Sequence, residues 1–74
     1  MHLRMDMRKL VGRNVKRARI AAGMTQEQLA ERSGFRQQYI SGLERGQRNP
    51  TIVSIYEFGR ALGVSHEQLV AAGD

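Results

Sequence analysis

Two adjacent glutamines and a serine lie in the stretch FRQQYISGLERG, residues 35–46, whose remaining residues have the pattern of a short buried helix. At about 100° per residue, five residues share one side of that helix within an arc of roughly 140°: Gln37, Gln38, Ser41, Gly42 and Arg45. The other side carries mostly apolar residues that would face inward: Tyr39, Ile40, Leu43 and Glu44. The first set is called the polar strip below.

Glutamine carries a hydrogen-bond acceptor and a donor side by side. Adenine presents a matching pair, N7 and N6–H, in the major groove of DNA, and a bidentate contact discriminates bases by roughly 1–3 kcal/mol. Gln37 and Gln38 at a helix start, with Ser41 one turn later, therefore suit the reading of base edges. Taken alone, ordinary surface polarity explains the glutamines better, because glutamine is a good helix former.

The residues around the polar strip have the spacing of a helix-turn-helix motif. Such a motif needs a small residue where its helices cross, a glycine in the turn and apolar residues on the second helix. In this chain those residues are Ala30, Gly34, and the pair Ile40 and Leu43. The sequence therefore predicts a helix-turn-helix over residues 26–45, with the polar strip on its outer surface.

Glycines and capping residues divide the chain into five short predicted helices, with no alternating run of strand length. The helices are expected over about residues 7–22, 26–33, 36–45 and 52–62, and from about residue 66 onward. Apolar spacing predicts buried residues on the first and fourth helices: Val11, Val15, Ala18, Ala22, Ile52, Ile55, Phe58 and Leu62. The expected fold is all-α, a compact five-helix bundle that forms a single domain over residues 1–74.

Positive charge is concentrated in the first third of the chain. Residues 1–24 carry seven basic residues and one acidic residue, a net charge of 7 − 1 = +6. Residues 25–74 carry five basic and six acidic residues, which gives 5 − 6 = −1. A basic end on a nearly neutral body favours a polyanion bound on one face, while the alternative is a solvated basic helix.

Several other functions have no support in the sequence. His2 and His66 lie far apart without clustered acidic or thiol partners, so neither a metal nor a cofactor is predicted. No phosphate-binding loop, nucleophile elbow or close carboxylate pair indicates an enzyme, and no small-molecule ligand is evident. No apolar run has the length of a membrane span, and the absence of cysteine fits a reducing cytoplasm.

The runs TQEQLAERSG, YISGLERGQRNP and ALGVS resemble the phage-repressor and Cro-like helix-turn-helix proteins, also called the Xre family. With the first helix included, the resemblance covers about 60 of the 74 residues. It implies a lambda-repressor-like fold and sequence-specific binding of double-stranded DNA by a transcriptional regulator. Among short members of this kind, the pattern is most similar to controller proteins of restriction–modification operons; small Cro-like repressors and DNA-binding antitoxins are the alternatives.

The resemblance also implies residue roles. Gln37, Gln38 and Ser41 correspond to base-reading positions, and Gln26 to a glutamine that contacts a phosphate and braces the recognition helix. Further DNA backbone contacts are implied for a set of flanking residues: Arg36, Tyr39, Arg48, Asn49, Arg13 and Arg17. Arg19 and Glu44 correspond to an internal ion pair, and the inward position of Glu44 independently requires a partner.

The chain departs from the family pattern at three places. Gly42 replaces a larger polar residue, and the gap could let the helix approach a thymine methyl or the DNA backbone closely. Gly59 replaces an alanine in the fourth helix, which suggests close helix packing. The N-terminal segment exceeds the minimal domain, and residues 1–7 are interpreted as a flexible arm, with a helical extension or a DNA-contacting arm as alternatives.

One recognition helix reads only three or four base pairs, so a symmetric homodimer on a roughly palindromic operator is expected. The predicted dimer surface consists of residues outside the buried stripe of the last two helices: Val53, Tyr56, Glu57, His66 and Val70. The alternative function is an antitoxin-type module that binds a toxin and regulates its own operon.

Overall fold

The computed structural model describes residues 6–72 and contains five helices. These are α1 (Met7–Ala21), α2 (Gln26–Ser33), α3 (Gln37–Glu44), α4 (Ile52–Leu62) and α5 (His66–Val70). The described residues include no strand, and the predicted all-α five-helix fold is confirmed. None of their helices combines the length and the apolar character that crossing a membrane requires.

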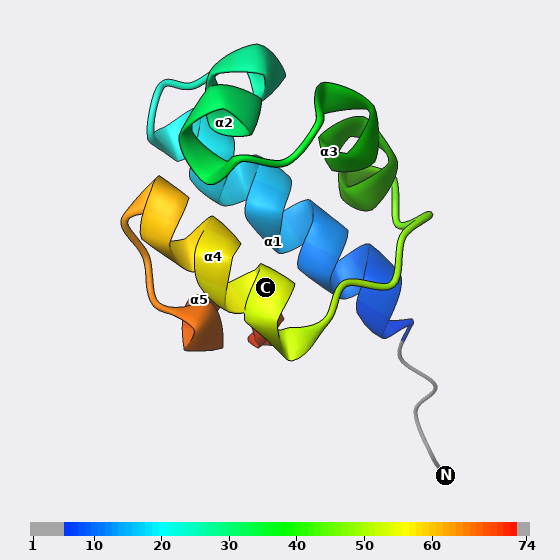
Figure 1. The fold of residues 1–74 in the computed structure, drawn as a ribbon. Helices are drawn as coiled ribbons and strands as arrows, with labels where there is room; N and C mark the ends of the chain where they lie inside the picture. Colours follow the sequence, from blue (N-terminus) through cyan, green and yellow to red (C-terminus); the bar gives the residue numbers. More distant parts are fainter. Residues whose placement is uncertain (1–5, 73–74) are drawn as a thin grey trace, which may run out of the picture.

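The long helix α1 lies at the centre of the bundle (Figure 1). It packs against α3 on one side and against α5 and α4 on the other, while α2 joins the two groups by packing against α3 and α4. The helix-turn-helix of α2 and α3 therefore rests on α1 through α3 and on α4 through α2, with Gln37 and Gln38 of the polar strip on the outside of the bundle.

The helix ends follow the capping signals in the sequence. Thr25 and Gln28 form one capping box and Ser65 and Gln68 form another, as the sequence predicts. Asp6 caps α1 by accepting hydrogen bonds from the backbone N–H groups of residues 8 and 9. Met7 is already helical, and the rest of the predicted N-terminal arm, residues 1–5, lies outside the described residues.

The core is built from apolar residues of all five helices. The side chains with almost no exposed surface are Val15, Leu29, Ile40, Leu43, Phe58 and Leu69. Two predicted core residues are wrong: Ala22 is exposed because α1 ends one residue earlier, and Ile52 is 82% exposed. Ile52 lies about 120° around α4 from the buried Phe58, and in the first turn no other helix covers it.

Asn14 is the buried polar residue of the described core. Its side-chain amide donates hydrogen bonds to the backbone carbonyl oxygens of Leu69, at 3.0 Å, and Ala71, at 2.9 Å. Because a helix end leaves its last carbonyl groups without partners inside the helix, Asn14 satisfies two acceptors at the end of α5. The side chain thereby ties the last helix to α1.

Candidate nucleic-acid interface

The polar strip lies on the open side of α3. Gln37 and Gln38 are exposed and Ser41 is half-buried. The side chains of these three residues line one shallow pocket together with Gln26 from α2 and Arg45 from the end of α3. The structure therefore brings together the three predicted base-reading residues and the predicted bracing glutamine.

A buried ion pair fixes α3 relative to α1 and α2. Arg19 donates to Glu44 through Nε, at 2.7 Å, and through a terminal nitrogen, at 3.0 Å. The Glu44 side chain is only 3% exposed and that of Arg19 only 12%. Hydrogen bonding to the carboxylate raises the pKa of the Arg19 guanidinium, which outweighs the opposite effect of its partial burial. The ion pair predicted from the sequence is present.

Gln26 adds a third bond to the same carboxylate, since its side-chain amide donates to Glu44 at 3.1 Å. Arg19 also donates to the backbone carbonyl of Met24, which precedes α2, at 2.8 Å. Arg19 and Glu44 therefore connect three helices at one point. The bracing role of Gln26 is visible here, while its contact with a phosphate stays a prediction.

Gly12 lets α1 and α3 approach closely. A Cβ atom at Gly12 would overlap the backbone carbonyl oxygen of Leu43 and lie 3.2 Å from the carbonyl carbon of Glu44. The turn after α3 is close to the start of α1 in the same way, because a Cβ at Gly46 would lie 3.0 Å from the Cα of Lys9. Lys9, which the sequence analysis did not single out, is thus placed beside the end of α3.

Aromatic rings support the other end of α3. Phe35, in the turn before α3, stacks on the buried Phe58 with ring centroids 4.5 Å apart. Tyr39 stacks on Phe35 at 5.4 Å, and the guanidinium of Arg48 lies over the Tyr39 ring at 5.4 Å from its centroid. The core therefore positions Tyr39, which in turn positions Arg48.

The comparison with known proteins identifies the family. A model of the HTH_3 helix-turn-helix family matches residues 15–69. The chain belongs to this helix-turn-helix family.

Two curated relatives match over most of the chain. An HTH-type transcriptional regulator of Sinorhizobium fredii, y4dJ, is 60% identical over 70 residues, which is 95% of this chain and 91% of the relative. The control protein C.SmaI of Serratia marcescens is 36% identical and covers 89% of this chain and 79% of its own length. The family resemblance read from the sequence is confirmed.

A solved structure shows a similar protein on DNA. The controller protein C.Esp1396I, in a tetramer with its natural 35-base-pair operator, matches with a TM-score of 0.77 and 40% identity. The match covers 84% of this chain and 82% of that one.

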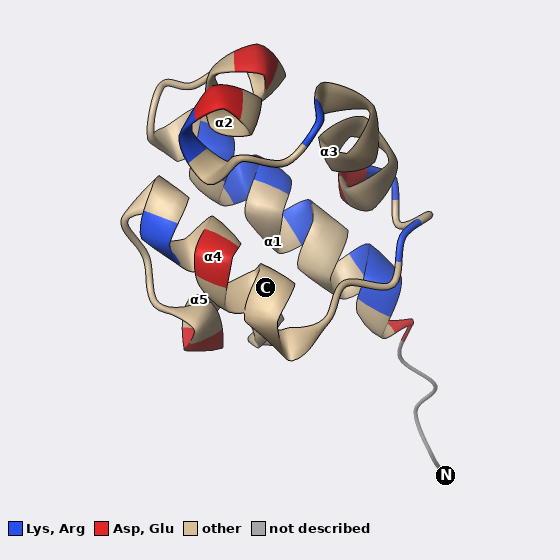
Figure 2. Ribbon diagram, viewed as in Figure 1, with Lys and Arg blue, Asp and Glu red and all other residues tan. Residues whose placement is uncertain are grey.

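Three of the predicted DNA backbone contacts gather beside the helix-turn-helix. Arg36, Tyr39 and Arg48 line one groove at the start of α3, which also includes Gln38 and Ser54. Figure 2 shows basic segments at the start of α3, in the loop after it and along α1. The groove therefore has the charge and the position for a phosphate next to the polar strip.

The remaining predicted backbone contacts are more widely spread. Asn49 lies in a hollow with Met7, Arg8 and Pro50, near the start of α1. Arg13 is exposed on α1. Arg17 lines a hollow with Gln68 and Leu69 of α5, on the side of α1 that faces away from α3, so nothing of the polar strip lies around it.

The structure corrects the interpretation of Gly42. This glycine is buried, and a Cβ atom there would lie 2.9 Å from Nε of Arg48. The space is therefore filled by the Arg48 side chain, and it does not form an open gap for a thymine methyl. At Gly59 the close contact is with the turn between α4 and α5 and with the start of α5, because a Cβ there would lie 2.8 Å from the carbonyl oxygen of Val64 and 3.4 Å from the backbone nitrogen of His66.

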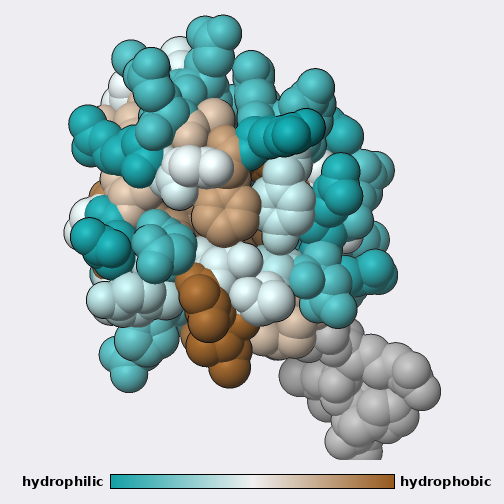
Figure 3. All heavy atoms as spheres, viewed as in Figure 1, coloured by the Kyte–Doolittle hydropathy of each residue, from teal (hydrophilic) through white to brown (hydrophobic). Residues whose placement is uncertain are grey.

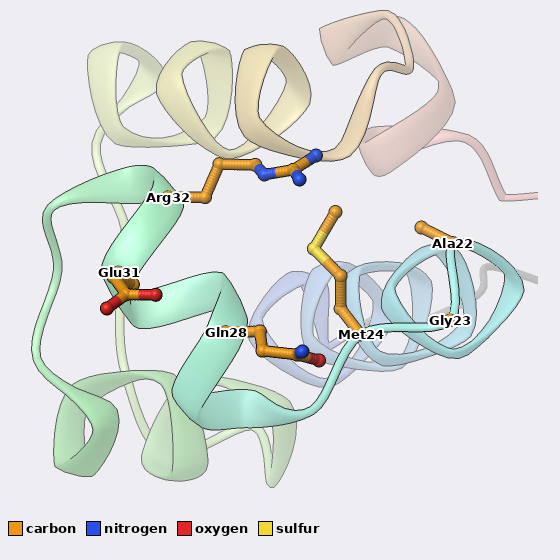
Figure 4. Close-up of a pocket in the computed structure, with 6 residues that line it drawn as sticks. All are labelled: Ala22, Gly23, Met24, Gln28, Glu31 and Arg32. Carbon is orange, nitrogen blue, oxygen red and sulfur yellow. The ribbon is translucent and has the colours of Figure 1, made fainter.

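A separate pocket lies away from the polar strip. Figure 4 shows its six lining residues, from the end of α1, the following turn and α2: Ala22, Gly23, Met24, Gln28, Glu31 and Arg32. None of the predicted DNA-contacting residues belongs to it.

Proposed function

We propose that this chain is a sequence-specific transcriptional regulator that inserts α3 into the major groove of operator DNA. The observation that carries the proposal is a pair of exposed amides and a half-buried hydroxyl on a helix that a buried ion pair holds. The relatives support it, since they are HTH-type regulators and control proteins and C.Esp1396I is solved with its operator. Because these relatives are regulators and control proteins, a regulatory function is favoured over that of an antitoxin or an enzyme.

In the proposed interface, one group of residues supplies affinity for DNA and another supplies sequence preference. The groups that contact the DNA backbone lie beside the strip and, farther from it, on α1 and in the loop after α3, and they attract phosphates without distinguishing sequences. In this proposal those residues are Gln26, Arg36, Tyr39, Arg48, Asn49 and Arg13. Gln37, Gln38 and Ser41 supply the sequence preference, because their side chains can form hydrogen bonds with base edges and the Arg19–Glu44 pair fixes the helix that carries them.

Gln37→Ala is expected to relax the preference at one base pair of each half-site by about 1–3 kcal/mol. The amide pair that matches adenine is lost, while the phosphate contacts and the fold are unchanged. Affinities for the operator, for single-base variants and for random duplex measure this effect. Arg36→Ala is the comparison, because loss of a phosphate contact weakens all duplexes by the same factor. A uniform loss for Gln37→Ala as well would contradict base reading.

We further infer a symmetric homodimer through α4 and α5. Val53 is 68% exposed, Tyr56 50% and Val70 38%, and Ile52, in the first turn of α4, is 82% exposed. The Tyr56 and His66 rings lie 6.1 Å apart, which joins the two helices across this surface. Figure 3 shows strongly hydrophobic residues gathered over the region of α4 and α5. Exposed apolar side chains that gather on one surface are a feature of protein interfaces.

Val53→Asp is expected to weaken self-association at least tenfold, because dimerisation would bury an unpaired carboxylate. Sedimentation at micromolar concentration, with and without operator duplex, measures the dimer fraction. Ile20→Asp is the matched control, since Ile20 is 59% exposed on α1, outside the inferred surface. Only monomer in the unsubstituted protein under both conditions would disprove the homodimer.

A further inference from the structure

Arg45 stands at the end of the polar strip and has no role in the interface described so far. It is the exposed C-cap residue of α3 and lines the same pocket as Gln37, Gln38 and Ser41. On the helical wheel it falls between Ser41 and Gln38, at about 80° from Gln37. Arg45 is therefore within the base-reading strip, and not on its flank where Arg36 and Arg48 lie.

The guanidinium of Arg45 is held in place by neutral groups. One terminal nitrogen donates to the Ser41 hydroxyl, while Nε and the other terminal nitrogen donate to the Gln47 side-chain oxygen at 3.3 Å each. Within residues 6–72, the ion pairs involve Arg8, Arg19 and Arg60, so the charge of Arg45 is not neutralised there. Of its five N–H groups, three are used and one on each terminal nitrogen is available.

Arg45 also provides a long side chain at the C-terminal end of the strip, where the neighbouring Gly42 has none. Gly42, farther around the wheel, contributes no side chain, and the space beside it is occupied by Arg48. An arginine fork is the commonest partner of guanine, whose O6 and N7 accept two N–H groups in the major groove. Its rigid plane suits this bidentate contact better than a point charge would.

On these grounds, and resting on the proposed function, we propose that Arg45 is a further specificity-determining residue, which reads a guanine in each half-site. Ser41 and Gln47 are its positioning residues, because they orient the guanidinium before DNA binds. Ser41 then acts through Arg45 in addition to any base contact of its own.

The test is selection of binding sites from random duplex DNA by the unsubstituted protein, R45A and R45Q. At one position per half-site, the unsubstituted protein should select guanine, and R45A should lose that preference by roughly 5- to 150-fold. R45Q should shift the preference at the same position toward adenine, because a glutamine amide matches adenine. Preferences at the other positions should stay as they are.

Arg32→Ala is the control, because it removes one positive charge from the separate pocket at α2. Thermal unfolding of each variant shows that the fold is retained. R45A could instead lose affinity for all sequences equally, with the slope of log affinity against log salt concentration smaller by about one. This result would overturn the proposal in favour of a phosphate contact. Unchanged selection by both variants would also overturn it. If the unsubstituted protein selected no sequence, the proposed function itself would fail.

Discussion

Replacing Glu44 by alanine is expected to lower the free energy of unfolding by about 3–5 kcal/mol, because it leaves a buried charge without its partner. The Arg19 side chain is only 12% exposed, and it would lose both hydrogen bonds to the carboxylate. A domain of this length is stable by about 4–11 kcal/mol in total. Urea denaturation followed by circular dichroism should therefore show a large part of the variant unfolded at low denaturant.

Arg60→Ala is the matched control for Glu44→Ala, because it also breaks one arginine–glutamate pair. The Arg60–Glu57 pair has a 3.6 Å separation and side chains that are 65% and 41% exposed. A pair of this exposure contributes about 0–1 kcal/mol. If the two substitutions lowered the free energy of unfolding equally, the buried pair would not have the special role in positioning α3 that we assign to it.

The parts of the fold that were predictable from sequence depend on local chemistry. The capping boxes at Thr25 and Ser65 and the turn glycine Gly34 set the boundaries of helices through their immediate neighbours, and the structure agrees with them to within one or two residues. The Arg19–Glu44 pair was predictable because an acidic residue on the inward side of a helix requires a partner. The family resemblance then indicated which residue that partner is.

The parts that sequence analysis missed depend on contacts between distant segments. Asn14 reads as an ordinary polar residue of a charged helix until the end of α5 brings two carbonyl groups to it. Ile52 lies three residues before Ile55, which packs against the core, but it is about 120° around α4 from the buried Phe58. The Arg48 side chain fills the space at Gly42 because the loop after α3 folds back, and the sequence carries no signal for the path of that loop.

Gly12→Val is expected to lower the free energy of unfolding by about 3 kcal/mol or more, near the upper end of overpacking effects. The Cβ would overlap the backbone carbonyl oxygen of Leu43, and backbone of a packed helix cannot move aside as a flexible side chain can. The only relief is separation of α1 from α3. That separation would also stretch the bonds of Arg19 to Glu44, so the position of the polar strip would change with it.

Two measurements distinguish this effect from a general loss of stability. Lys16→Val places the same side chain at an exposed position one turn later on α1, where only the helix propensity changes, by less than about 1 kcal/mol. Operator binding is compared under conditions where both variants are folded. Gly12→Val should bind its operator more weakly, and its base preferences should weaken at the positions read by α3. Lys16→Val should keep the original base preferences. Normal stability and normal preferences in Gly12→Val would show that the contact between α1 and α3 tolerates a side chain. Close packing at Gly12 would then not be what holds the recognition helix in place.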